Sequence, residues 1–158
     1  MRLIAIERGG TIPADIAALP AEAHGVLAAT AQLYDTGGFE PPWICYLAVT
    51  NAMTVGTCGF KASPQDRRVE IAYFTFSGYE GKGIATQMAR QLITLAGAAD
   101  TDVTVAAQTL PERNASHRVL EKLGFTCVGS VEHPEDGTVL EWKKAVGVAQ
   151  QAHAARGR

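Results

Sequence analysis

The chain has 158 residues, of which 47% are hydrophobic and 19% charged, and its formal net charge is −2 with a pI near 6.1. This composition is typical of a globular domain, and the near-neutral charge argues against a nucleic-acid-binding protein that neutralises phosphates with a basic surface. No run of about 18 apolar residues is present, and charge interrupts the N-terminus too soon for a secretory signal, so we expect a cytoplasmic protein without a membrane span.

The length favours one domain over residues 1–144, followed by a weakly patterned tail at 145–158. Residues 2–8 predict a first strand, and residues 13–34, rich in Ala and Leu, predict two helices divided at Pro20. Three strands are predicted next, at 43–50, 54–61 and 68–76, followed by a helix at 82–96 that ends at Gly97. A strand at 102–109, a short helix at 114–124 and two last strands at 126–132 and 138–143 complete the order. This order predicts a mixed α/β sheet in which antiparallel hairpins flank a central pair of strands.

A glycine-bearing turn joins the third strand of that hairpin region to the next helix and reads Tyr-Glu-Gly-Lys-Gly-Ile-Ala-Thr, residues 79–86. Glycine lets the backbone turn tightly, and the start of a helix presents unpaired N–H groups within the positive end of its dipole. Such a turn suits a phosphate or pyrophosphate. We therefore expect a ligand with a diphosphate. The backbone N–H groups that would hold it are those of Gly81, Lys82, Gly83, Ile84, Ala85 and Thr86, helped by the Lys82 side chain and the Thr86 hydroxyl.

Two segments resemble the signatures of the GNAT superfamily of acyl-CoA-dependent N-acetyltransferases. Residues 69–74, Val-Glu-Ile-Ala-Tyr-Phe, followed by the glycine turn, are similar to the family's fourth strand and pyrophosphate loop, although Glu80 stands where the family has Arg or Gln. Residues 111–125, which end in Leu-Glu-Lys-Leu-Gly-Phe, are similar to the second signature. The resemblance covers residues 43–143 and implies a mainly antiparallel sheet of about seven strands flanked by about four helices.

The resemblance also implies the reaction and the place of the co-substrate. An acetyl group would pass from acetyl-CoA to a primary amine by direct attack in a ternary complex. The backbone of Phe74, Thr75 and Phe76 would pair with the pantetheine arm as an added strand, while the two phenylalanine side chains pack in the core. Asn114, which fits as the cap of the short helix, or its neighbour Arg113 would also contact CoA.

A direct attack still requires a base for the amine and a proton donor for the departing thiolate. Glu70 interrupts an apolar strand, and the resemblance implies that a Glu on this strand takes the amine proton; the alternative is a solvent-facing Glu on an alternating strand. For the acid, Ser116 is favoured over a tyrosine such as Tyr73 or Tyr79. His117 is interpreted as a surface histidine of the short helix.

Neither a nucleophilic cysteine nor a metal is needed for this reaction. Cys45, Cys58 and Cys127 lie in strand-like segments and are expected to be buried reduced thiols, and the four dispersed histidines predict no metal site. The acceptor is expected to be a small-molecule or peptide amine. Acidic residues would favour a cationic amine if they faced the pocket, and otherwise form a solvated acidic surface: Glu40, Glu132, Glu135 and Asp136.

Two further questions stay open at the level of the sequence. A non-catalytic acyl-CoA-binding or sensor module of the same fold would carry the same glycine turn. The oligomeric state is also open, with a homodimer as one option.

Overall fold

One mixed sheet of seven strands organises the computed structural model, which describes residues 1–16 and 19–147. The strand order is β1-β2-β3-β4-β5-β7-β6, and every neighbouring pair is antiparallel except β4 and β5. The strands are β1 (Arg2–Ala5), β2 (Cys45–Thr50), β3 (Met53–Phe60), β4 (Arg68–Thr75), β5 (Thr104–Thr109), β6 (Thr126–His133) and β7 (Gly137–Ala145). The predicted fold class, a mainly antiparallel mixed sheet of seven strands, is confirmed.

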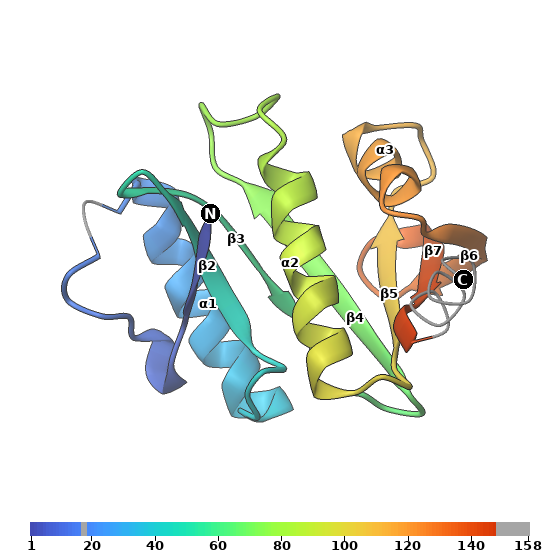
Figure 1. Ribbon diagram of the computed structural model, residues 1–158, viewed down its shortest axis with the longest axis horizontal. Coiled ribbons are helices and arrows are strands. Elements are labelled where there is room, and N and C mark those ends of the chain that lie inside the picture. The colour runs from blue at the N-terminus through green and yellow to red at the C-terminus, as the bar shows by residue number, and fades with distance from the viewer. Residues whose placement is uncertain (17–18, 148–158) are drawn as a thin grey trace, which may run out of the picture.

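Helices cover both faces of the sheet. Figure 1 shows α2 (Ile84–Ala99) crossing one face over β3 and β4, with α3 (Ala115–Lys122) on the same side, while α1 (Ala21–Gly37) lies behind β1 and β2. The described residues contain these three α-helices and a short 3-10 helix, η1 (Arg8–Gly10). The arrangement places the parallel connection β4-α2-β5 at the centre of the molecule.

The prediction of two helices within residues 13–34 is wrong. One helix, α1, begins directly after Pro20, and residues 13–16 are not helical; residues 17 and 18 lie outside the described part of the chain. Pro20 is the N-cap of α1 and has an extended backbone (φ −62°, ψ 155°). Proline is tolerated at the start of a helix because it lacks the N–H that an interior helical position would donate. Proline therefore starts the helix here instead of dividing two helices.

α2 packs its apolar face directly on the sheet. Helical spacing in the sequence predicts one apolar face made of Ile84, Met88, Leu92, Leu95 and Ala96. Four of these residues are buried and Leu95 is half-buried. Close approach depends on Gly56 of β3, since a Cβ there would lie 2.7 Å from the Phe74 carbonyl oxygen and 3.1 Å from the Met88 sulfur. The expected stop at Gly97 is wrong: this glycine is buried inside the last turn, and the helix continues to Ala99.

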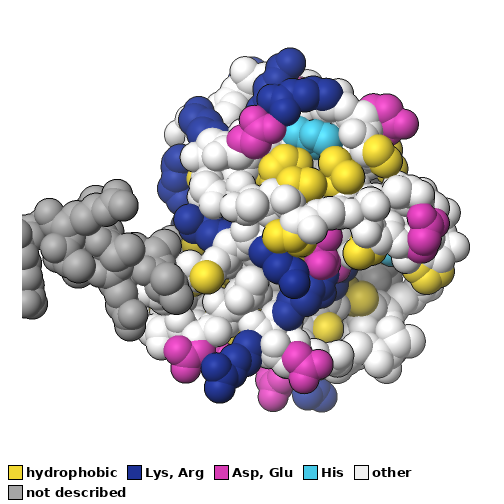
Figure 2. Space-filling view, turned by 90° about the vertical axis from the view of Figure 1, so that its right-hand side faces the viewer, with side chains coloured by type: hydrophobic (Ala, Val, Ile, Leu, Met, Phe, Trp, Pro, Cys, Tyr) yellow, Lys and Arg dark blue, Asp and Glu magenta, His cyan; other side chains and the backbone are white. Residues whose placement is uncertain are grey.

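The β6 end of the sheet is an open edge. Almost every residue of β6 is exposed, including the hydrophobic residues Val128 and Val131. Figure 2, which views the molecule from this end, shows small hydrophobic groups interspersed with Lys and Arg side chains. A homodimer remains a prediction from the sequence.

The predicted C-terminal tail lies outside the described residues from residue 148 onward.

Tyr34 joins α1 to the first two strands. Its buried hydroxyl donates to the Ile6 carbonyl oxygen at 2.8 Å and accepts from the Cys45 N–H at 2.9 Å. We expect Tyr34→Phe to lower the free energy of unfolding by about 2–4 kcal/mol, because both backbone groups would be left buried without a partner. Urea unfolding followed by circular dichroism measures this loss.

Tyr79→Phe is the matched control for that change. The Tyr79 hydroxyl has no hydrogen-bond partner among the residues that the structure describes, so its removal should change the free energy of unfolding by less than about 0.5 kcal/mol. Equal losses in the two variants would contradict the anchoring role of Tyr34.

Candidate active site

The two central strands separate soon after they begin. β4 and β5 pair only through Arg68–Glu70 against Thr104–Ala106, and Figure 1 shows them diverging toward their carboxyl ends. The edge of β4 that faces β5 therefore has no strand partner over residues 71–75. An extended ligand can add to a free edge of this kind. Of the three residues predicted to pair with pantetheine, Thr75 directs its backbone groups to this edge. The backbone groups of Phe74 and Phe76 point toward β3, where the Phe76 N–H donates to the Val55 carbonyl oxygen at 2.9 Å.

A cavity of about 110 Å³ lies in the opening between the two strands. Its walls include both faces of β4, the start of α3 and two residues of β5. The lining residues are Lys61, Glu70, Ile71, Ala72, Tyr73, Ala107, Gln108 and Ser116. The structure thus brings together the predicted base and the predicted acid, which are 46 positions apart in the sequence.

The glycine turn lies at the carboxyl end of β4. Gly81 and Gly83 both have a φ of +76°, a conformation that L side chains rarely adopt, and Gly83 forms the N-cap of α2 without a side-chain cap. The first helical hydrogen bond runs from the Gln87 N–H to the Gly83 carbonyl oxygen at 3.1 Å. Within the described chain, the N–H groups of residues 81–86 have no acceptor. The turn therefore supplies the unpaired donors that the predicted diphosphate site requires.

Glu80 turns back onto the loop that precedes it. Its carboxylate accepts a hydrogen bond from the Gly78 N–H at 2.9 Å, so this position, unusual for the resembling family, has a local role. A second carboxylate, that of Glu22 on α1, accepts from the Ser77 N–H at 2.7 Å. The Lys82 ammonium lies 5.7 Å from the centre of the Tyr79 ring. These side-chain contacts hold the segment that leads into the glycine turn. They leave the N–H groups of residues 81–86 free.

Glu70 lies at the point where β4 and β5 part. Its side chain is 12% exposed, so it is not the freely solvated carboxylate of the alternative interpretation. One oxygen, Oε1, lies 3.3 Å from Arg68, and the other is ion-paired with Lys61. The predicted base is thus positioned at the cavity and is already in contact with two cations.

Tyr73 and Ser116 lie on the other side of the opening from Glu70. Residues 70 and 73 of one strand point to opposite faces, and Ser116 comes from the first turn of α3. Burial raises the pKa of Tyr73, and a hydrogen bond with Ser116 opposes that rise. The two residues that the sequence left as competing proton donors are therefore neighbours.

Asn114 caps α3, as expected. Its side-chain oxygen accepts from the Ser116 N–H at 2.9 Å and the His117 N–H at 3.3 Å, while its amide group donates to the Glu112 carbonyl oxygen at 3.0 Å. Its neighbour Arg113 forms a bidentate pair with Glu121. The cap orients the helix turn that carries Ser116; a contact between Asn114 and CoA stays a prediction.

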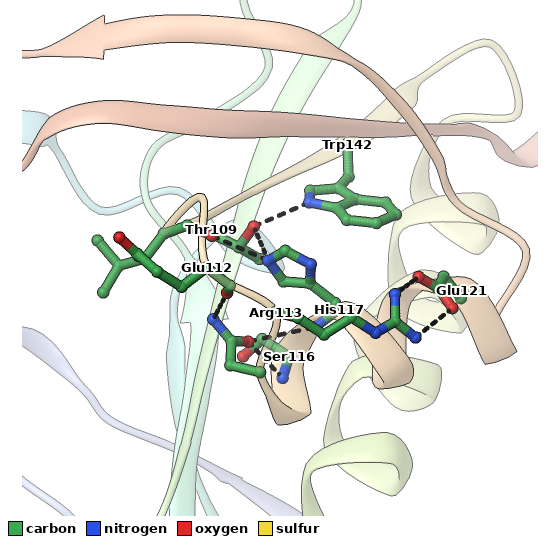
Figure 3. A network of polar contacts seen from close by, with 9 residues as sticks. Thr109, Glu112, Arg113, Ser116, His117, Glu121 and Trp142 are labelled. Carbon is green, nitrogen blue, oxygen red and sulfur yellow. Dashed lines mark hydrogen bonds and ion pairs between the residues drawn. The ribbon is translucent and has the colours of Figure 1, made fainter.

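The interpretation of His117 as a surface residue is wrong, since its side chain is 5% exposed. Its Nε2 lies 3.1 Å from the Thr109 hydroxyl and 2.9 Å from the Leu110 carbonyl oxygen, and its ring packs against Trp142, which donates to the same hydroxyl (Figure 3). A sequence signal existed: His117 precedes the apolar Leu120 by three residues and so shares its face of the helix. This network joins α3 to β5 and β7.

Three of the four acidic residues considered for the acceptor side have local side-chain partners. Glu132 accepts a hydrogen bond from Thr138 at 2.6 Å, Asp136 lies 3.4 Å from His133, and Glu40 accepts from Ser63 at 2.5 Å. None of them lines the cavity between β4 and β5. The structure therefore gives no support to an acidic frame around the acceptor amine.

Burial separates the three cysteines. It raises the pKa of Cys58 to about 12 and that of Cys45 to about 11, whereas Cys127 is exposed, contrary to expectation, because β6 is the edge strand. We expect a thiol reagent at pH 8 to label one cysteine quickly, and Cys127→Ser to remove that fast phase, since a buried protonated thiol is a poor nucleophile. Rapid labelling of Cys58 in the folded variant would contradict this assignment.

The raised thiol pKa values also predict a pH dependence. The folded protein keeps the Cys45 and Cys58 protons at pH values where the unfolded chain, with an ordinary thiol pKa of 9.0, loses them. Stability from these groups is fully present below pH 9 and is lost as the pH rises toward about 12. Urea midpoints between pH 8 and pH 10.5 should therefore fall, and a Cys58→Ala variant should show a smaller fall.

Comparison with known proteins places the chain in a family. Residues 13–126 match the family described as the acetyltransferase (GNAT) domain. The chain belongs to the GNAT acetyltransferase family. This match confirms the resemblance seen in the sequence. The family match begins at residue 13, whereas the resemblance began at residue 43.

The chain is also similar to curated proteins named N-acetylaspartate synthetase. N-acetylaspartate synthetase from Rattus norvegicus is 29% identical over 120 residues, 75% of this chain and 38% of the relative, and that from Xenopus tropicalis is 32% identical over 96 residues, 60% and 35%. The chain thus spans little more than a third of these relatives.

Two solved structures share the fold at 20% identity and a TM-score of 0.62, namely RimL, a ribosomal alpha-N-protein acetyltransferase, and the aminoglycoside acetyltransferase AAC(6')-Ib, both in complex with coenzyme A. Each alignment covers 80% of this chain. It covers 72% of the RimL chain and 80% of the AAC(6')-Ib chain.

Among residues 1–16 and 19–147, no group of three or more His, Cys, Asp or Glu side chains could hold a metal ion. No helix in the same part of the chain is long and apolar enough to cross a membrane.

Proposed function

We propose that this GNAT protein transfers the acetyl group of acetyl-CoA to a primary amine by direct attack in a ternary complex. One observation carries the proposal: the opening between β4 and β5 gathers Glu70, Tyr73 and Ser116 around a single cavity. That cavity adjoins a free strand edge that leads to the unpaired amides of the glycine turn.

In this reaction the chain first holds the co-substrate. The N–H groups of residues 81–86 bind the diphosphate, and the free edge of β4 pairs with the pantetheine arm, which directs the thioester into the opening. A backbone N–H of β4 hydrogen-bonds the thioester oxygen as negative charge develops on it. Holding both reactants in this geometry removes much of the entropic barrier.

The chemical step needs two proton transfers. The amine nitrogen attacks the thioester carbonyl carbon, a C–N bond forms and the C–S bond breaks. Glu70 takes the proton from the amine, directly or through a water molecule, and the departing thiolate takes a proton from Ser116 or its neighbour Tyr73. The products are the N-acetylated amine and CoA.

A non-catalytic acyl-CoA-binding module is the second candidate. One observation favours it: both oxygens of Glu70 already contact cations, Lys61 and Arg68, as those of a purely structural carboxylate would. In that case CoA would bind at the glycine turn without turnover.

Binding and turnover separate the two candidates. Calorimetric titration with CoA, ATP and NAD should show binding of CoA, and a panel of primary amines with acetyl-CoA, followed by thiol release, should show acceleration above hydrolysis. Aspartate belongs in the panel because the relatives are named for N-acetylaspartate. Binding of CoA without acceleration by any amine favours the sensor; binding of ATP alone contradicts both.

A further inference from the structure

A larger cavity, of about 460 Å³, lies between α1 and the strands β3 and β4. Its walls are apolar: α1 contributes Val26 and Leu33, and β4 contributes Ala72 and Phe74. A volume of this size is typical of small-molecule sites, which are lined mainly by hydrophobic side chains. The Phe74 side chain, expected to pack in the core, is instead 55% exposed beside this cavity, whereas Phe76 is buried as expected.

This apolar cavity is continuous with the candidate active site. It shares Lys61, Ala72 and Tyr73 with the smaller cavity between β4 and β5. Alternate residues of a strand lie on one face about 7 Å apart, so Glu70, Ala72 and Phe74 form a row that leads from the base into the apolar cavity. An amine whose nitrogen lies at Glu70 would therefore extend its substituent over the small Ala72 side chain toward Phe74.

The apolar cavity offers no free charge to a substituent. Lys61 is the one Lys, Arg, Asp, Glu or His side chain among its lining residues, and its ammonium is ion-paired with Glu70. The two cysteines in the lining are held as neutral thiols, since burial raises the pKa of Cys45 to about 11 and that of Cys58 to about 12. An ionised acceptor group would lose its hydration there without gaining a partner.

A charged cavity of about 480 Å³ also touches Lys61 and Glu70 and is the competing place for the acceptor. Its other cations already have carboxylate partners: Arg68 contacts both Glu70 and Glu141, and Lys143 lies 3.9 Å from Glu141. An anionic acceptor would have to displace these pairs, whereas an apolar group displaces only water from the neighbouring cavity.

We propose that the acceptor is a primary amine with an uncharged, apolar substituent that occupies the cavity between α1 and β4. This inference rests on the proposed acetyltransferase function and names the class of amine that the same site takes. Aliphatic and aromatic monoamines fit this description, and amino acids with ionised side chains do not.

A series of straight-chain amines from ethylamine to hexylamine, with 2-phenylethylamine and aspartate added, tests the proposal through thiol release from acetyl-CoA. With the wild-type protein, kcat/KM should rise about fourfold for each added methylene, the factor expected when a methylene is buried. Ala29→Trp, which places a large ring at a cavity-lining position of α1, should flatten this rise, so that kcat/KM falls far more for hexylamine than for ethylamine.

Ala28→Trp is the matched control, because residue 28 is exposed on the same helix and does not line the cavity. It should keep the dependence on chain length. A flat series in the wild-type protein, or a higher kcat/KM for aspartate than for hexylamine, overturns the apolar acceptor while leaving the acetyltransferase function in place. Acceleration by none of these amines counts against both proposals.

Discussion

Glu70→Gln is expected to lower kcat by about 10²- to 10⁴-fold, the usual contribution of a general base, with little change in the affinity for CoA. The amide keeps the size of the carboxylate and cannot accept the amine proton. Glu70 is 12% exposed, lines the cavity between β4 and β5, and is the carboxylate that the structure places there. Steady-state rates at saturating acetyl-CoA, with calorimetry of CoA binding, measure the two quantities separately.

Glu141→Gln provides the control for this change. Glu141 also contacts Arg68 and is similarly buried, at 14% exposed, but it belongs to β7 and does not line the cavity. Its replacement removes a comparable ion pair, so any general effect of lost charge pairing should appear equally in both variants. Equal losses of kcat would assign Glu70 a structural role and favour the non-catalytic candidate.

Gly83→Val is expected to weaken CoA binding by at least about tenfold. The glycine has a φ of +76° at the N-cap of α2, where a β-branched side chain is strained, and relief of that strain would rotate the amides that point toward the diphosphate. Isothermal titration with CoA measures the change. Pantetheine, which lacks the diphosphate, should bind the variant and the wild-type protein equally.

Gly137→Val separates the effect on the site from backbone strain in general. Gly137 is the first residue of β7, directly after the turn that follows β6. It has a similar φ of +73° and open space around its Cβ position. The two variants should therefore lose comparable stability, while Gly137→Val keeps its affinity for CoA. Unchanged binding in Gly83→Val would show that the turn does not hold the diphosphate.

Local signals in the sequence predicted most of the fold. Alternation and turn residues predicted all seven strands, and the spacing of Ile84, Met88 and Leu92 predicted the buried face of α2. The errors arose where one residue type has two structural meanings. Pro20 can divide helices or start one, and Gly97 can end a helix or pack inside it, and only the tertiary contacts decide between these.

The candidate site was less predictable because its parts come from distant segments. The pairing of β4 with β5 stops after three residues, which depends on strand direction and twist and leaves no local pattern. Glu22 bonds Ser77, in the approach to the glycine turn, from 55 residues away, and Tyr73 of β4 is a neighbour of Ser116 of α3. By contrast, Glu80 bonds to a residue two positions earlier, a local turn contact of the kind a sequence can indicate.

A crystal structure of the complex with CoA tests the central claim most directly, because it shows where the diphosphate binds. We expect the diphosphate oxygens to accept hydrogen bonds of about 2.7–3.2 Å from the N–H groups of residues 81–86, with the pantetheine arm along the free edge of β4. A diphosphate bound elsewhere on the protein, with the Glu80 carboxylate turned into the glycine loop in its place, would contradict the account.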